Sequence, residues 1–366
     1  MLRGLLRTVR YAHGWTSGAG VRVEETEIER EGVRIPATLL LPARGKGPFP
    51  GWIAMGGITR MGRFHPQLVR FGNALASSGA AVLLPEIPEW QKLEVPPSVT
   101  GPTLRGAIQT LGIHPEVLPG KVGLIGFSFG APQVAIAAAR EELADHVAGI
   151  VLFGGYCCLD RTLLFGLTGD HEWEGVDYSL TPDPYGRWVV ASNYLADIPG
   201  CEDAHDVAAA LRCLATATSD QRIPAWEPHH DAMIRDLRLA LPKRHQALFD
   251  LFATPTTGTR PDRDECADIG LRLADACRRV DPLLEPAPDL AKVHLPTQLI
   301  HGRGDRLIPF TEGMRMVNGL PSTAEKSLTV TGMFAHSATH SPPGLFDKFR
   351  EGTALFGAVR SLINTV

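Results

Sequence analysis

The sequence predicts an α/β fold, in which helices cover both faces of a mostly parallel sheet and a long helical segment is inserted. Short apolar runs alternate with segments of helical periodicity from Val21 to Phe153, and the alternation resumes at Thr297. Such alternation is typical of parallel sheets that are covered on both faces. Residues 156–290 contain helix-like segments and proline-rich joints, and we expect no strand there. A helical stretch of this length between two successive strands predicts a separate cap.

Three sections follow from this pattern: an N-terminal part of the core over residues 1–155, a helical cap over residues 156–290, and a C-terminal part of the core over residues 291–366. Leucines and arginines at helical spacing near the N-terminus indicate either a small surface helix or a disordered leader, and we favour the helix. In the rest of the first section, the expected strands are 21–31, 33–41, 52–55, 80–84, 122–127 and 146–153, and the expected helices are 65–78 and 103–111.

The cap and the last section are read in the same way. The helices expected in the cap are 185–197, 204–216, 231–241 and 262–280. The proline-rich stretch 281–290 is interpreted as a linker. The last section is expected to contain strands 297–300 and 326–330, helices 310–320 and 346–363, and a loop over residues 332–341.

The composition is that of an ordinary globular protein, with 44% hydrophobic and 21% charged residues among 366. A net charge of −4 and the lack of a long basic stripe argue against a nucleic-acid partner. No apolar run reaches the roughly 18 residues of a membrane span. The six cysteines form no C-x-x-C pair, so we expect reduced, buried thiols in a cytoplasmic protein, with a disulfide as the alternative. The composition is compatible with a homo-oligomer.

The segment from Lys121 to Arg140 carries the main chemical signal. A short apolar strand runs into the pattern GFSFG at 126–130, and an alanine-rich helix follows. A G-x-S-x-G pattern between a strand and a helix is typical of a nucleophile elbow, which places Ser128 at the apex of a strained turn. The two glycines are then needed because the strand and the helix pass close to each other. An ordinary glycine-rich turn is the alternative interpretation.

A catalytic serine needs a base that takes its proton and an acid that orients the base. In elbow enzymes the acid and then the histidine follow the serine along the chain. Asp305 comes after the predicted strand 297–300 and His336 after the predicted strand 326–330. Both therefore lie beyond the carboxyl ends of strands, where ligands bind in open α/β sheets. We predict a catalytic triad of Ser128, Asp305 and His336.

Each of these assignments has a plainer alternative. Asp305 would serve equally well as a turn residue whose carboxylate binds its own backbone, which is common for aspartates in loops. His336 would also suit an exposed loop, and His340 is a nearby competitor for the role of base. Asp160, shortly after the preceding strand, is a second candidate acid.

Backbone N–H groups are expected to stabilise the oxyanion that forms during acyl transfer. One donor should be Phe129, the residue after the nucleophile. The other should come from the glycine-containing loop after the strand 52–55, where Gly57 and Ile58 are both candidates. A plain glycine turn is the alternative for this loop.

These motifs resemble those of serine hydrolases of the α/β-hydrolase fold superfamily. The resemblance covers Val21 to Asn364 apart from the cap, and it depends on GFSFG at 126–130, HGRGD at 301–305 and His336. It implies an eight-stranded sheet with the cap inserted between the sixth and seventh strands, and it assigns the nucleophile, acid and base to Ser128, Asp305 and His336. Many members have a His-Gly pair after the third strand, whereas this chain has Met55-Gly56. The paired N-terminal strands resemble those of dienelactone-hydrolase-like and S9-peptidase-like catalytic domains.

The function that this implies is hydrolysis of a carboxylic ester of a small or medium-sized substrate through an acyl-enzyme on Ser128. No cofactor or metal is implied. The same triad would also act on an amide, a peptide, a thioester or a carbon–carbon bond beside a ketone. A member that only binds its ligand is a further alternative, although a binding protein has no need for all three triad residues.

Overall fold

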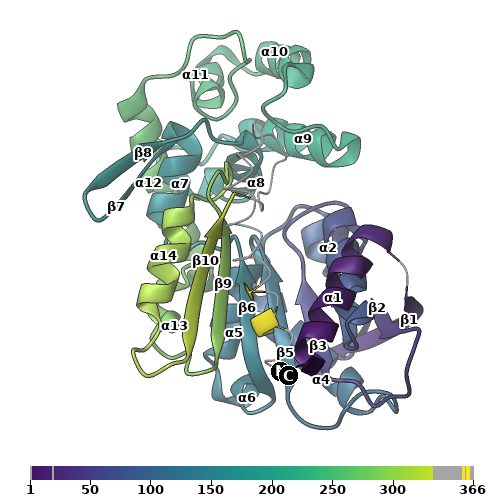
Figure 1. Ribbon diagram of the computed structural model, residues 1–366. Helices are drawn as coiled ribbons and strands as arrows, with labels where there is room; N and C mark the ends of the chain where they lie inside the picture. Colours follow the sequence, from purple (N-terminus) through teal and green to yellow (C-terminus); the bar gives the residue numbers. More distant parts are fainter. Residues whose placement is uncertain (1, 19, 333–356, 359, 363–366) are drawn as a thin grey trace.

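A computed structural model of the chain describes residues 2–18, 20–332, 357–358 and 360–362. A large sheet forms its centre (Figure 1). The strands of this sheet are β1 (Val21–Arg30), β2 (Val33–Pro42), β3 (Gly51–Met55), β4 (Ala81–Pro85), β5 (Val122–Phe127), β6 (Val147–Phe153), β9 (Thr297–Gly302) and β10 (Lys326–Thr331). They lie in the order β1-β2-β4-β3-β5-β6-β9-β10. The pairs β1–β2 and β2–β4 are antiparallel and the others parallel, which confirms the mostly parallel eight-stranded sheet.

The exposure of each strand follows its position in the sheet. β3 and β4 are buried at every residue, as continuous apolar runs in a doubly covered parallel sheet must be. In β3, Trp52 and Ala54 belong to the hydrophobic cluster on one face, whereas Ile53 and Met55 belong to the cluster on the other. β1 is one of the two edge strands, and its many charged side chains disfavour pairing of that edge with another chain.

Helices cover both faces of the sheet. Helices α4 (Thr100–Gly112) and α5 (Gly130–Ala138) pack on one face, and α1 (Leu2–Ser17) and α2 (Pro66–Ser77) on the other (Figure 1). The helix expected near the N-terminus is therefore present. Its Tyr11 is buried and meets the ring of Phe71 edge-on, with 6.0 Å between the ring centroids.

The segment between β6 and β9 folds around a second hydrophobic cluster, which includes its Trp188, Phe249 and Phe252 and also Leu93, Val95 and Ile308 of the core. Its long helices are α7 (Leu159–Thr168), α8 (Pro184–Tyr194), α9 (His205–Gln221), α10 (Asp231–Ala240), α11 (Lys243–Phe252) and α12 (Arg263–Val280). We call residues 156–284 the inserted segment. Its two ends meet, because the Tyr156 hydroxyl donates to the carbonyl of Leu284 at 2.8 Å.

One expectation for this segment is wrong, because it contains two short strands, β7 (Asp170–Trp173) and β8 (Val176–Ser179), which pair as an antiparallel hairpin. The turn residues Glu174 and Gly175 have φ values of 51° and 78°, as a two-residue hairpin turn requires. The strands are mostly polar and half-exposed, so no run of apolar residues marks them. Their stability comes instead from cross-strand pairs such as His171 and Tyr178, whose rings stack with their centroids 5.1 Å apart.

The remaining expectations concern the cysteines, membrane spans and the C-terminal region. All six cysteines are free thiols, and Cys213 is exposed, contrary to the expectation of burial. Among the helices of the described residues, none combines the length and apolar character needed to cross a membrane. The expected loop 332–341 and helix 346–363 lie largely outside the described residues, although residues 357–358 and 360–362 are helical.

Candidate active site

Ser128 occupies a sharp turn between β5 and α5. Its φ is +53°, a left-handed conformation that non-glycine residues rarely adopt and that costs on the order of 1–3 kcal/mol. Two backbone hydrogen bonds hold it there. Its N–H donates to the carbonyl of Phe153 at 2.8 Å, and its carbonyl accepts from the N–H of Ala131 at 3.0 Å. The chain thus forces a serine into a strained position where a glycine would fit without strain.

The two glycines of the GFSFG pattern are required by close backbone approach. A β-carbon on Gly126 would lie 2.4 Å from the carbonyl oxygen of Gly130, and one on Gly130 would lie 2.4 Å from the carbonyl oxygen of Gly56. Neither contact can be relieved by moving a side chain, because both involve backbone atoms. This is the local geometry that the nucleophile-elbow interpretation predicts for a glycine on either side of the serine.

The loop after β3 lies directly against Ser128. β3 and β5 are parallel neighbours, and Met55 pairs with Gly126, so both strands end at the same level. A β-carbon on Gly57 would lie 3.3 Å from the Ser128 hydroxyl oxygen. Phe129 follows Ser128 at the start of α5, where the helix dipole favours negative charge. Of the candidate oxyanion donors, Phe129 therefore lies beside Ser128 in the chain and Gly57 lies beside it in space, and Ile58 follows Gly57 in the same loop.

Asp305 is almost fully buried, with 2% of its surface exposed, in the turn that follows β9. Its Oδ1 atom accepts from the N–H groups of Leu307 at 2.9 Å and Ile308 at 3.1 Å. Its Oδ2 atom lies 3.7 Å from Nε2 of His301, which bonds the Ile308 carbonyl at 2.9 Å. Oδ1 therefore stabilises the turn, as expected for an aspartate that binds its own backbone. The two hydrogen bonds to Oδ1 also fix the orientation of the whole carboxylate.

Ser128 and Asp305 lie at the same edge of the sheet. β5, β6 and β9 are successive parallel strands, so Ser128 and Asp305 follow the carboxyl ends of two strands that are separated by one. β10 also runs parallel to β9 and ends at this edge. His336, the predicted base, and its competitor His340 lie outside the described residues. The alternative acid Asp160 lies in the first turn of α7 and forms an ion pair with Arg278 at 2.7 Å.

Sequence reasoning missed two residues that contact the loop after β3. The hydroxyl of Tyr185, from α8, donates to the carbonyl of Ile58 at 3.1 Å. Ser219, from α9, accepts from the N–H of Arg60 at 3.1 Å. These partners are 127 and 159 positions apart in the chain, so no local sequence pattern links them.

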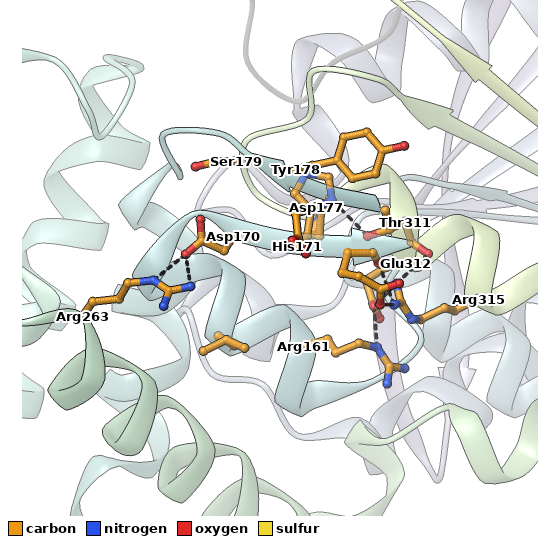
Figure 2. Close-up of a pocket in the computed structure, with 13 residues that line it drawn as sticks. Arg161, Asp170, His171, Asp177, Tyr178, Ser179, Arg263, Thr311, Glu312 and Arg315 are labelled. Carbon is orange, nitrogen blue, oxygen red and sulfur yellow. Dashed lines mark hydrogen bonds and ion pairs between the residues drawn. The ribbon is translucent and has the colours of Figure 1, made fainter. Parts of the chain in front are cut away.

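A separate pocket of about 500 Å³ opens between the β7–β8 hairpin, α7 and the helix α14 (Phe310–Gly319) (Figure 2). None of the predicted site residues lines it. Most of its charged groups are paired: Glu312, fully buried, accepts from Arg161 at 3.0 Å, and Arg263 and Arg315 pair with Asp170 and Glu172. In the described part of the chain, no group of three or more histidine, cysteine or acidic side chains is arranged to hold a metal ion.

Comparison with known proteins gives structural matches alone. No protein-family model matches the chain, and no curated protein matches its sequence. A brefeldin A esterase, described as a bacterial homologue of human hormone-sensitive lipase, has 14% identity and a TM-score of 0.51 over 99% of this chain and 84% of its own. The chain has the α/β-hydrolase fold. The α/β-hydrolase fold predicted from GFSFG and HGRGD is thereby confirmed.

Two further structures with lower scores are similar to this chain. The esterase Est22 has 14% identity and a TM-score of 0.49, over 99% of this chain and 85% of its own. A putative dienelactone hydrolase from Klebsiella pneumoniae has 14% identity and a TM-score of 0.47, over 93% and 99%.

Met55, which departs from the His-Gly pair of many α/β-hydrolases, is the last residue of β3. It is 1% exposed and belongs to the same hydrophobic cluster as α4 and α5. An apolar side chain suits this position because it packs in the core. With methionine at this position, the loop from Gly56 onward lies beside Ser128.

Proposed function

We propose that this protein is a serine hydrolase that cleaves a carboxylic ester of a small or medium-sized substrate through an acyl-enzyme on Ser128. The observation that carries the proposal is the left-handed backbone of Ser128 between two glycines that tolerate no β-carbon. Backbone strain persists only where the surrounding structure enforces it, and it clusters at functional sites. A purely structural turn at this place would favour glycine in place of Ser128.

In the proposed reaction, Ser128 Oγ attacks the ester carbonyl while His336 takes the hydroxyl proton. The carbonyl oxygen becomes an oxyanion, which the N–H of Phe129 and that of Gly57 or Ile58 stabilise. His336 then gives its proton to the leaving alcohol, and the acyl group remains on Ser128. Water, activated by His336, hydrolyses this ester and restores the serine. Asp305 orients the imidazole and stabilises its positive charge, a role to which a rigidly held carboxylate is suited.

We further propose that the inserted segment acts as a cap. Its residues Tyr185 and Ser219 touch the loop beside Ser128, which supports a position over the catalytic edge of the sheet. A cap there would exclude water and favour small substrates over polymers.

No cofactor enters this reaction. The same groups would serve amide, peptide, thioester or carbon–carbon bond cleavage, and a panel of substrates followed in single turnovers would rank these bonds.

Fluorophosphonate labelling followed by intact-mass spectrometry tests the proposal. An activated serine displaces fluoride and gains one phosphonyl group, so wild type should show a single adduct. Ser128→Ala should show none, whereas Ser179→Ala, which removes an exposed serine at the end of β8, should label like wild type. A folded wild-type protein that forms no adduct, and hydrolyses no short-chain p-nitrophenyl ester, would contradict the proposal and favour a protein that only binds its ligand.

A further inference from the structure

We infer that Tyr185 and Ser219, both from the inserted segment, are positioning residues for the reaction at Ser128. They hold the loop of residues 56–60, the oxyanion loop, in the conformation that receives the negative charge of the transition state. This inference depends on the proposed function and adds to it a role for the inserted segment in catalysis itself.

Tyr185 holds the oxyanion loop through one backbone carbonyl. Its hydroxyl donates to the carbonyl of Ile58 at 3.1 Å, and this bond fixes the peptide plane next to the one that carries the Ile58 N–H. Tyr185 is itself held in the first turn of α8, where its N–H donates to the Asp183 carboxylate at 3.0 Å. Burial raises the pKa of Tyr185 above its ordinary value, so the hydroxyl stays protonated and remains a donor at physiological pH.

Ser219 holds the other end of the same loop. Its Oγ atom accepts from the N–H of Arg60 at 3.1 Å and lies 3.2 Å from the Thr59 hydroxyl oxygen. Ser219 lies in the last turn of α9, so two different helices of the inserted segment reach the loop. Beside it, Asp220 pairs with the Arg60 side chain at 2.6 Å, but both of these side chains are about half exposed. Such an exposed pair contributes little, typically about 0–1 kcal/mol.

The oxyanion loop needs this support because β3 ends before it. Met55 is the last residue with a strand partner, and the loop continues past it directly against the nucleophile, with Gly57 in contact with Ser128. Oxyanion donors are effective only when they are held in place before the reaction. A displacement of about 1 Å in a catalytic group can cost roughly 10²-fold in rate. Tyr185 and Ser219 should therefore affect the transition state more than the bound substrate.

The alternative is that these contacts merely attach the inserted segment to the core. The two roles differ in what they stabilise. An attachment contributes to the free energy of unfolding, and its loss affects binding of substrate and transition state alike. A positioning contact affects kcat and the affinity for an oxyanion analogue, while KM and binding of an unreactive ligand change little.

The test uses the full chain with Tyr185→Phe, which removes one oxygen atom, and Ser219→Ala. Turnover of p-nitrophenyl acetate is measured together with inhibition by an alkyl trifluoromethyl ketone, to which Ser128 adds reversibly to give an oxyanion. We expect kcat and ketone affinity to fall by about 10-fold or more in each variant, with KM within about twofold of wild type. Ser219→Thr should restore both, and Asp220→Asn, the matched control, should leave both within about twofold.

The outcomes separate this inference from the proposed function. If wild type does not react with a fluorophosphonate, the proposed function fails and this inference fails with it. If wild type reacts but Tyr185→Phe and Ser219→Ala keep wild-type kcat and ketone affinity, the positioning role is wrong and the hydrolase remains. A rise in KM with unchanged kcat, and therefore an equal fall in kcat/KM, would also overturn the positioning role. If Tyr185→Phe does not fold, the comparison of Ser219→Ala with Ser219→Thr decides the question alone.

Discussion

A β-carbon on Gly130 would lie 2.4 Å from the carbonyl oxygen of Gly56, so the helix after the nucleophile and the loop after β3 touch backbone to backbone. Two segments that are far apart in sequence are thus placed relative to each other by the absence of one side chain. The helix that follows Ser128 and the loop after β3 cannot approach further, and any side chain at residue 130 would push them apart.

The first prediction concerns this contact. Gly130→Ala should destabilise the protein by about 1–3 kcal/mol, because the new methyl group meets backbone that cannot rotate away, and it should also abolish esterase activity. Urea denaturation and ester turnover measure the two effects. The matched control is Gly112→Ala at the end of α4, where a β-carbon would meet nothing within 4 Å. That variant should be neutral or stabilised by about 0.4–1 kcal/mol. An active, stable Gly130→Ala protein would show that the two segments do not touch.

The second prediction concerns the strain at Ser128. Both Ser128→Ala and Ser128→Gly should be inactive, but the glycine variant should be the more stable of the two by about 0.5–1 kcal/mol. Glycine adopts a φ of +53° without steric cost, and this gain exceeds its larger entropy loss on folding. Chemical denaturation of the two variants gives the difference. If the alanine variant is the more stable, Ser128 does not carry the left-handed backbone in solution.

The third prediction separates the two roles of Asp305. Asp305→Asn keeps an oxygen for the N–H groups of Leu307 and Ile308, so it should fold with near wild-type stability while activity falls by about 10³–10⁴-fold. Asp305→Ala leaves those two donors, of which that of Ile308 is buried, without their acceptor and should also lose about 1–3 kcal/mol of stability.

The control for Asp305 is the other candidate acid. Asp160→Asn should retain most activity, because the Asp160 carboxylate pairs with Arg278 on α12. Loss of activity in Asp160→Asn together with retention in Asp305→Asn would exchange the two assignments.

The fourth prediction concerns pH and His171. Burial, and then the positive charge of Arg315, lower the pKa of His171 below its ordinary value of 6.5. The folded protein therefore favours neutral His171, and the resulting stability is present above pH 6.5 and is lost as pH falls through the lower folded pKa.

His171→Phe keeps the ring contacts with Tyr178 and Phe310 but removes this titration. The free energy of unfolding of the variant should fall less steeply than that of wild type as pH is lowered from 7 to 5. Parallel curves for the two proteins over that range would rule out a contribution from His171.

The sequence predicted those parts of the fold in which the residue pattern of one short segment is enough to indicate its structure. The strand, serine and helix around Ser128 are contiguous, and the glycines that mark them have a local steric cause. The parallel strands are recognisable because burial on both faces demands unbroken apolar runs. Asp305 could be placed because it comes directly after such a strand.

The parts that it did not predict depend on contacts between distant segments. The β7–β8 hairpin is stabilised by side-chain pairs such as His171 and Tyr178, and its residues are too polar to mark strands. Residues 281–290 are predicted to be a linker because of their prolines. They instead pack tightly, since Leu284 and Leu290 are buried and the carbonyl of Leu283 accepts from Gln133 at 3.0 Å. The contact of Tyr185 with Ile58 joins two elements that no local pattern relates.

The hydrogen bond between Tyr156 and Leu284 has a consequence for how this chain can diversify. The inserted segment leaves and rejoins the core at one point, so a change in its length need not shift the register of any sheet strand. Such a change would leave Ser128 and Asp305, the proposed nucleophile and acid, in place while altering the proposed cap. Any such change would have to keep the bonds that Tyr185 and Ser219 make to the loop of residues 56–60, so the rest of the segment is freer to vary than these two residues.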